Sequence, residues 1–148
     1  MSSYRLRKVP DPILRQKALE VPDGETCSVL IAAMRHAMAK YGGVGLAANQ
    51  IGVLKRVIVW NTKDLVGYAI NPVLTDLRGE QRGTEGCLSI PGERGRINRA
   101  RALTLTGRMM SGPTFSIEVE DHLARVIQHE VDHLNGILWT DHLNGATL

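Results

Sequence analysis

Apolar residues recur along the chain with two different periods, and the two periods divide it into segments of different expected structure. Over residues 25–41 they follow one another at spacings of three and four, as Cys27, Leu30, Ile31, Met34, Met38 and Tyr41. This is the period of one face of an α-helix. Gly42 and Gly43 come next, and glycine commonly ends a helix. The pattern therefore predicts an amphipathic helix over residues 25–41.

Four later segments have the short apolar runs or the alternation that is typical of β-strands. They cover residues 56–60, 66–70, 102–106 and 114–119. A second helix is predicted over residues 121–134, with its end at Asn135 and Gly136. The strands are not separated by crossover helices. The expected fold class is therefore α+β, with a mostly antiparallel sheet packed around a central second helix and one amphipathic helix towards the N-terminus.

The first 22 residues have neither period. Residues 4–22 carry Pro10, Pro12 and Pro22 among mixed charges, and this composition predicts an irregular arm on the surface. With 148 residues, 43% of them hydrophobic, the chain is large enough to bury a core and to leave a pocket beside it. We expect one domain over residues 1–148.

Charge and composition exclude several classes of protein. The 18 basic and 15 acidic residues are spread along the chain, so no basic arm for nucleic acid is indicated. No apolar stretch approaches the roughly 20 residues that cross a bilayer, and the start lacks the apolar segment of a signal peptide. Only Cys27 and Cys87 are present, which indicates a reducing compartment. We expect a soluble cytoplasmic protein that binds neither membrane nor nucleic acid.

The strongest chemical signal is the run from His129 through Glu130 to His133 inside the second predicted helix. Four residues make about one helical turn, so both imidazoles project from one face and can bind one metal ion. Glu130 points to the side of that face, an offset that suits a base better than a ligand. The alternative is a solvated helix face that carries two unrelated histidines.

A catalytic site of this kind needs a third protein ligand. The position at which one protease class has a third histidine is Trp139, and no glutamate follows Glu130 as another class requires. His142 is a poor candidate because Gly136 should end the helix before it. Cys87 remains, as a thiolate ligand, although a free cysteine is more often a small buried apolar residue.

Three segments together resemble the signature motifs of peptide deformylases in residue identity, order and spacing. They are GVGLAANQIG at 43–52, EGCLSIPG at 85–92 and QHEVDHLNG at 128–136. The resemblance implies a metal-dependent hydrolase that removes the formyl group from N-formylmethionine of newly synthesised polypeptides and releases formate. It also implies one divalent ion held by Cys87, His129 and His133, usually Fe(II), with zinc, nickel or cobalt able to replace it.

The resemblance further implies roles for the residues around the ion. Gln50 and the backbone N–H of Leu88 match the donors that stabilise the developing oxyanion, and Glu130 matches the group that moves the proton. Gly45 matches a position where the backbone pairs with the peptide substrate as an added strand; the alternative is a glycine-rich turn. The substrate side as a whole would comprise Val44, Gly45, Glu85, Gly86, Arg94, His122 and Arg125.

The sequence departs from the family pattern near the pocket for the first side chain. Arg125 and His122, four and seven positions before His129, share its helix face, and many family members have an apolar residue at position 122. Gly83 stands where a bulky aliphatic residue is common. We expect a more open or more polar methionine pocket, lined by Val44, Gly83, His122 and Arg125. The alternative is an exposed His122 in the first helical turn.

Two further points remain expectations. Arg94 matches a position near the substrate backbone, with a surface salt bridge as the alternative. The chain ends at Leu148, whereas many bacterial members continue through a further helix, so a transient contact with the ribosome is in doubt.

The rival functions are a peptidase of the same helical motif and a non-catalytic metal-binding module, but a purely structural metal site would need neither Glu130 nor Gln50.

Overall fold

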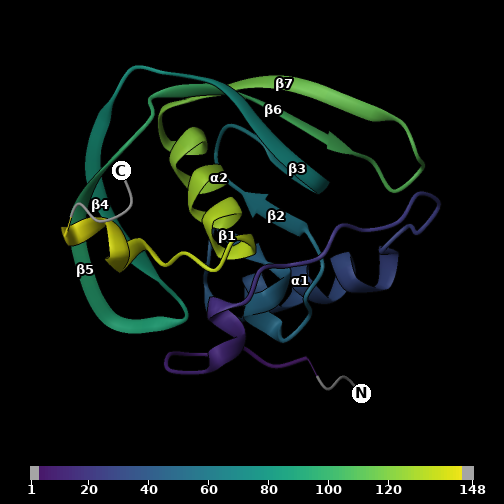
Figure 1. Cartoon of the computed structure of the whole chain (residues 1–148), viewed down its shortest axis with the longest axis horizontal. Helices are drawn as coiled ribbons and strands as arrows, with labels where there is room; N and C mark the ends of the chain where they lie inside the picture. The colour runs from purple at the N-terminus through teal and green to yellow at the C-terminus, as the bar shows by residue number, and fades with distance from the viewer. Residues whose placement is uncertain (1–3, 145–148) are drawn as a thin grey trace.

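The computed structural model describes residues 4–144, and its largest element is a five-stranded antiparallel sheet (Figure 1). The strand order is β1-β2-β3-β6-β7. These strands are β1 (Gly45–Ala47), β2 (Val57–Asn61), β3 (Val66–Arg78), β6 (Ala102–Arg108) and β7 (Thr114–Glu120). Each strand pairs antiparallel with its neighbour. The α+β class with a mostly antiparallel sheet is confirmed.

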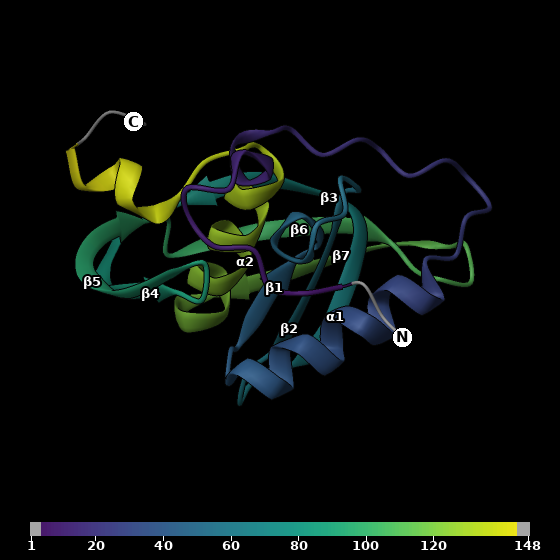
Figure 2. The ribbon, with the colours of Figure 1, turned by 90° about the horizontal axis from the view of Figure 1, so that it is seen from below.

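Two helices cover opposite faces of the sheet because β2 is apolar on both sides. Ile58 and Trp60 pack in one core cluster with α2 (Asp121–Leu134), whereas Val57 and Val59 pack in another with α1 (Ser28–Tyr41). Successive residues of a strand point to opposite faces, so the unbroken apolar run is what a strand between two helices requires. Figure 2 shows α1 running along its side of the sheet.

A separate hairpin, β4 (Gln81–Cys87) with β5 (Ile90–Arg99), lies on the other side of α2 from the large sheet (Figure 1). Ile90 and Ile97 are its buried apolar side chains and share a small core with Leu14 and Trp139. The sequence predicted no strands here, because few of these positions are apolar and pairing between the two strands, rather than a buried face, holds them extended.

The N-terminal arm is more integrated than the expected surface segment. It contains the 3₁₀-helix η1 (Pro12–Arg15), and Leu14, Ala18 and Val21 are buried. Its backbone N–H groups donate to three distant carbonyls: Arg7 to Gln50, Val9 to Ser89 and Ala18 to Leu134, at 2.7, 2.9 and 2.8 Å. The arm therefore ties together the three segments that carry the motifs.

The predicted element bounds differ from the observed ones mainly at the ends. The second helix spans residues 121–134 as expected. The first begins at Ser28, three residues later than predicted, because Cys27 adopts a left-handed backbone conformation with φ of 57°. The strand expected over residues 66–70 continues to Arg78. Within residues 4–144, no helix has the length and apolarity needed to cross a membrane.

Candidate metal centre

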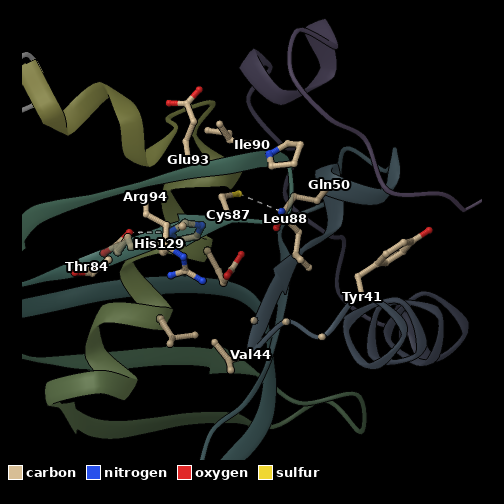
Figure 3. Close-up of a pocket in the computed structure, with 18 of the residues that line it drawn as sticks. Tyr41, Val44, Gln50, Thr84, Cys87, Leu88, Ile90, Glu93, Arg94 and His129 are labelled. Carbon is tan, nitrogen blue, oxygen red and sulfur yellow. Dashed lines mark hydrogen bonds and ion pairs between the residues drawn. The ribbon is translucent and has the colours of Figure 1, made fainter.

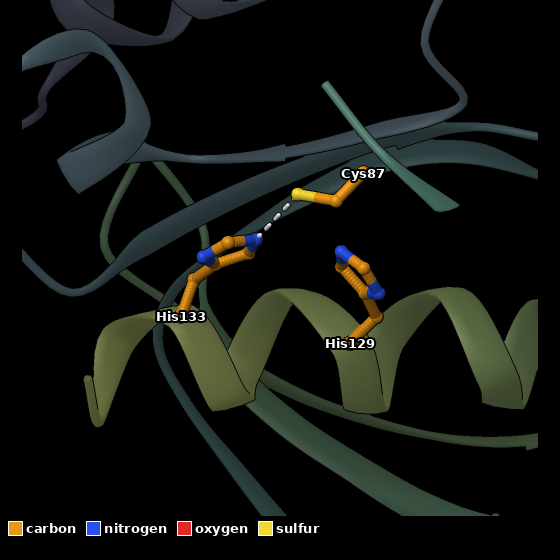
Figure 4. A group of neighbouring side chains, drawn as sticks. All are labelled: Cys87, His129 and His133. Atoms are coloured by element: carbon orange, nitrogen blue, oxygen red, sulfur yellow. Dashed lines mark hydrogen bonds between the residues drawn. The ribbon is translucent and has the colours of Figure 1, made fainter. Parts of the chain in front are cut away.

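Three ligand-type side chains meet where the hairpin approaches α2 (Figure 4). Cys87 is the last residue of β4, and His129 and His133 lie one turn apart on α2. Their ligand atoms all lie within 4.8 Å of one another, and Sγ of Cys87 is 3.3 Å from Nε2 of His133. The structure thus brings together the three residues that the sequence proposed, across 42 positions of the chain between Cys87 and His129.

The donor set fits a divalent transition metal. One thiolate and two imidazoles are the ligands that zinc- and iron-type ions accept, and three protein ligands leave a further coordination position for water or substrate. Burial, together with the nearby His129 and Arg99, lowers the pKa of His133 well below its ordinary value. His133 is therefore neutral, as a ligand must be.

The negative charges around His129 also favour a bound metal cation. Burial lowers the pKa of His129, but Glu130, Cys87 and Glu85 outweigh that effect and raise it to about 10. The surroundings of this imidazole are therefore anionic, and they favour a positive charge at this position. A bound divalent cation would supply that charge and take the place of the proton.

Glu85 orients the imidazole of His129 through a hydrogen bond. Oε1 of Glu85 lies 2.8 Å from Nδ1 of His129, and a carboxylate can only accept, so Nδ1 is the donor and Nε2 is left free to bind a metal. Arg99 donates to both oxygens of Glu85 at 2.8 and 2.9 Å. Burial raises the pKa of Glu85, but Arg99 and His129 outweigh it and hold the pKa well below the ordinary value.

Glu130 is buried beside the three ligands. Burial is the largest influence on its pKa and raises it to about 7, against the opposing effect of His129. Among residues 4–144, its Oε1 has no hydrogen-bond partner. A Cβ added to Gly45 would lie 2.6 Å from the other oxygen, Oε2, so the strand backbone approaches the carboxylate very closely. Glu130 is thus a carboxylate poised near neutral pH and free to engage a ligand.

Gln50 brings an amide to the same place. Its Oε1 accepts from the backbone N–H of Ala47 at 2.9 Å, which leaves Nε2 directed towards Ser89 and Cys87. Nε2 donates to Oγ of Ser89 at 3.1 Å and lies 3.7 Å from Sγ of Cys87. Leu88 follows Cys87 in the same turn (Figure 3). An amide donor therefore stands next to the cysteine.

These groups open into one cavity of about 680 Å³ (Figure 3). The predicted residues that line it are Val44, Gly45, Gln50, Glu85, Gly86, Cys87, Leu88, Arg94, His122, Arg125, His129 and Glu130. His133 is buried behind them. Leu6 and Lys8 of the arm, and Tyr41 at the end of α1, also line the cavity. No local sequence signal marks these three, because only the path of the arm and the packing of α1 bring them there.

Several pocket residues differ from the expectation in detail. Glu85 was assigned to the substrate, but its carboxylate is taken up by Arg99, Arg125 and His129. The guanidinium of Arg125 is likewise bound within the protein, to Glu85. Gly83 is not among the residues that line the cavity. His122 is exposed and also lines the cavity, so both interpretations of that residue apply in part.

His142, the histidine of the second DHLNG segment, is not part of the cluster of three ligand-type side chains among the described residues. Its Nε2 is 2.9 Å from Oδ2 of Asp132, and Asp132 also accepts from Arg99 at 2.6 Å. Asp132 therefore links the 3₁₀-helix η3 (Trp139–Asn144) to α2 and the hairpin. Trp139, the position tested for a third histidine, is buried in the small core under the hairpin.

Comparison with known proteins gives a consistent result. A family model described as "Polypeptide deformylase" matches residues 3–147. A peptide deformylase of Syntrophomonas wolfei is 44% identical over 142 residues, covering 95% of this chain and 93% of that protein. One from Halothermothrix orenii is 44% identical over 145 residues, covering 95% and 94%.

Solved structures agree with the sequence comparison. The peptide deformylase of Thermotoga maritima superposes with a TM-score of 0.90 at 35% identity, covering 96% of this chain and 98% of that one. The enzyme of the Vibrio parahaemolyticus bacteriophage VP16T, solved with actinonin, gives 0.88 at 39% identity, covering 90% and 98%. Together with the cavity, the ligand cluster and the buried glutamate, these matches establish that the chain belongs to the polypeptide deformylase family.

Proposed function

We propose that this protein is a metal-dependent peptide deformylase that hydrolyses the formamide of N-formylmethionyl peptides at the start of newly made polypeptides and releases formate. The observation that carries the proposal is the placement of a three-ligand cluster, a buried carboxylate and an amide donor in one cavity. A formamide is a poor electrophile, and its hydrolysis needs an activated water, a proton carrier and a site for the oxyanion.

Cys87, His129 and His133 would hold the ion, which when bound supplies a Lewis acid and lowers the pKa of water. Glu130 accepts the proton of the attacking water and returns it to the departing amine, and its pKa of about 7 suits both steps. Gln50 Nε2 and the backbone N–H of Leu88 donate to the oxygen on which negative charge develops. These donors stand beside the cysteine, so they act on the same carbonyl.

The peptide would bind as an extended strand along Val44 and Gly45, at the start of β1. Val44 is exposed and lines the cavity, and Gly45 follows it with its α-carbon turned to Glu130. A substrate strand that pairs with this backbone places its N-terminus at the ligand cluster. Gly86 and Arg94 line the other side of the cavity, on the hairpin, where they would contact the substrate backbone.

Further details of the proposal concern the metal and the setting. We expect Fe(II) as the working ion, with zinc, nickel or cobalt as substitutes, because a thiolate with two imidazoles accepts all four. We expect the enzyme to act in the cytoplasm, on chains emerging from the ribosome. Metal analysis of anaerobically purified protein decides the first point, and co-sedimentation with ribosomes decides whether a transient contact forms.

The activity is tested with two peptides that differ only in the N-formyl group. Formyl-Met-Ala-Ser should release one formate per molecule and leave Met-Ala-Ser intact, while acetyl-Met-Ala-Ser should react much more slowly. Cleavage between residues would instead identify a peptidase; the presence of tryptophan at position 139, where a metal-ligating histidine would be needed, argues against it. Binding of metal without any formate release would identify a non-catalytic metal-binding protein.

A further inference from the structure

Arg125 occupies an unusual place for an arginine, in the angle between α2 and the hairpin. Its side chain is 8% exposed. Its guanidinium donates to Oε2 of Glu85 at 2.7 Å and also contacts backbone oxygens of both strands, those of Gly83, Ile97 and Gln81, at 3.3–3.5 Å. Arg125 therefore connects α2 to β4 and β5 at once, and its charge is neutralised inside the protein rather than offered to the cavity.

Gly83 is what makes room for this guanidinium. A Cβ at Gly83 would lie 3.0 Å from NH2 of Arg125, 3.1 Å from Cζ and 3.2 Å from Nε, so the planar group lies directly against the glycine. These distances are too short for an ordinary side chain without a shift of the arginine. The arginine cannot shift freely, because the shift would separate it from Glu85 and leave a buried carboxylate less well paired.

Glu85 connects this arrangement to the metal ligands. Arg99 of β5 and Arg125 of α2 bind the carboxylate from two elements, and its Oε1 receives the Nδ1 hydrogen of His129. The direction of the His129 imidazole thus depends on a carboxylate that two arginines fix. Groups that orient a ligating histidine commonly change metal affinity or activity by 10- to 100-fold when they are removed.

We propose that Gly83 and Arg125 are a matched pair, in which the glycine admits the guanidinium and Arg125 acts as a positioning residue that aligns His129 through Glu85. The catalytic part of this proposal rests on the proposed deformylase function; the part that concerns metal affinity does not. Arg125 also lines the cavity, together with His122, Val126 and His129 of the same helix, and its charge is paired with Glu85.

The proposal is tested by a double-mutant cycle of Gly83→Val, Arg125→Met and the two together. Gly83→Val alone should lower the melting temperature and weaken Ni(II) affinity, measured by competition with a chelator, by at least about tenfold because it displaces the guanidinium. Arg125→Met alone should weaken Ni(II) affinity by a similar factor. In the double variant, valine enters space that the guanidinium has left. Adding Gly83→Val to Arg125→Met should therefore lower the melting temperature and the Ni(II) affinity little further.

Gly83→Val could lower the melting temperature and the Ni(II) affinity equally in the wild-type protein and in Arg125→Met. That result would overturn the pairing, and so would failure of both valine variants to fold. Unchanged Ni(II) affinity of Arg125→Met would overturn the positioning role. Arg82→Met is the matched control: Arg82 lies on the same strand, is exposed, and donates to Oδ1 of Asn98 on the neighbouring strand. This variant should leave Ni(II) affinity unchanged.

Steady-state kinetics on formyl-Met-Ala-Ser then separate positioning from substrate binding. If Arg125 acts through His129, Arg125→Met should lower kcat by about tenfold or more with a change in KM of less than about threefold. A rise in KM with kcat unchanged would make Arg125 a substrate-binding residue instead. If the wild-type protein released no formate at all, the proposed function would fail, whereas the cycle in metal affinity would still decide the pairing.

Discussion

At the scale of single residues, the site depends on a few groups that are held in unfavourable surroundings. Glu130 is buried and has an oxygen with no hydrogen-bond partner in the described part of the chain. Burying such a group costs free energy, and the close approach of Gly45 of β1 to the carboxylate helps to enclose it. The cost is typical of a site where one group must change its protonation state during the reaction.

We predict that Glu130→Gln keeps the metal and loses at least about a hundredfold in kcat, because the amide has the same shape and cannot carry the proton. Metal content and formate release on the same preparation measure the two effects. Glu80→Gln is the control, since Glu80 is exposed in the turn between β3 and β4. A rate near that of the wild type would show that another group moves the proton.

Gly45→Ala should reduce the rate through the position of Glu130 rather than through the fold. The new methyl group would lie 2.6 Å from Oε2 of Glu130 and 2.8 Å from Cγ1 of Val126, so one of these side chains must move. A displacement of about 1 Å at a reacting group can cost on the order of a hundredfold. We expect kcat to fall at least about tenfold with a far-ultraviolet circular dichroism spectrum like that of the wild type. An unchanged kcat would mean that the close approach is not needed.

At the scale of elements, helix α2 carries two of the three candidate ligands and Glu130, and its C-terminal end packs against the arm. The helix ends after Leu134, and Gly136 follows with φ of +74°. The backbone oxygen of Arg15 in η1 lies 2.6 Å from where a Cβ of Gly136 would be. The arm and the end of α2 are therefore packed backbone to backbone at this glycine.

Gly136→Ala should destabilise the protein by two separate effects, a strained φ and a clash with backbone. Gly24→Ala is the matched control, because Gly24 has φ of +86° and nothing within 4 Å of its added Cβ. We expect the control to lose about 1 kcal/mol of unfolding free energy, from left-handed strain alone. Gly136→Ala should lose about 1–3 kcal/mol more. Urea unfolding measures both losses, provided that the m-values of the variants are equal. Equal losses in the two variants would show that the arm yields without cost.

At the scale of the whole molecule, the metal would join α2 to a hairpin that shares no strand pairing with the large sheet among the described residues. Among the described residues, β4 and β5 pair only with each other, and Cys87 belongs to this hairpin whereas His129 and His133 belong to α2. The hairpin is otherwise held by a small core, by the ion pairs of Glu85 and of Arg99 with Asp132, and by contacts of Arg125 with the backbone of both strands. A bound ion adds a link across this boundary and stabilises the folded state by mass action.

Removal of the metal should therefore loosen the hairpin more than the sheet. We expect a chelator to lower the melting temperature by about 5–10 °C, the effect of roughly 2–3 kcal/mol. Amide hydrogen exchange of β4 and β5 should speed up by about tenfold or more, while the exchange of β2 changes little. A uniform change over both sheets would mean that the ion does not act on the hairpin in particular.

The sequence by itself determined what depends on neighbours along the chain. The spacing of His129 and His133 fixes them on one face of α2 whatever surrounds it, because the helix repeats every 3.6 residues. The apolar periods likewise placed both helices and the four strands over 56–60, 66–70, 102–106 and 114–119. The motif segments carried the candidate chemistry, including Cys87 as the candidate third ligand.

Only the tertiary structure decided what depends on contacts between distant segments. The β4–β5 hairpin has little apolar pattern and is defined by its own cross-strand pairing, so no local signal could reveal it. Glu85 looks like a substrate residue in its motif, but Arg99 and Arg125 arrive from β5 and α2 and take up its oxygens. The fit of Arg125 against Gly83 joins positions 42 residues apart, and side chains so far apart along the chain meet only when the fold packs α2 against the hairpin.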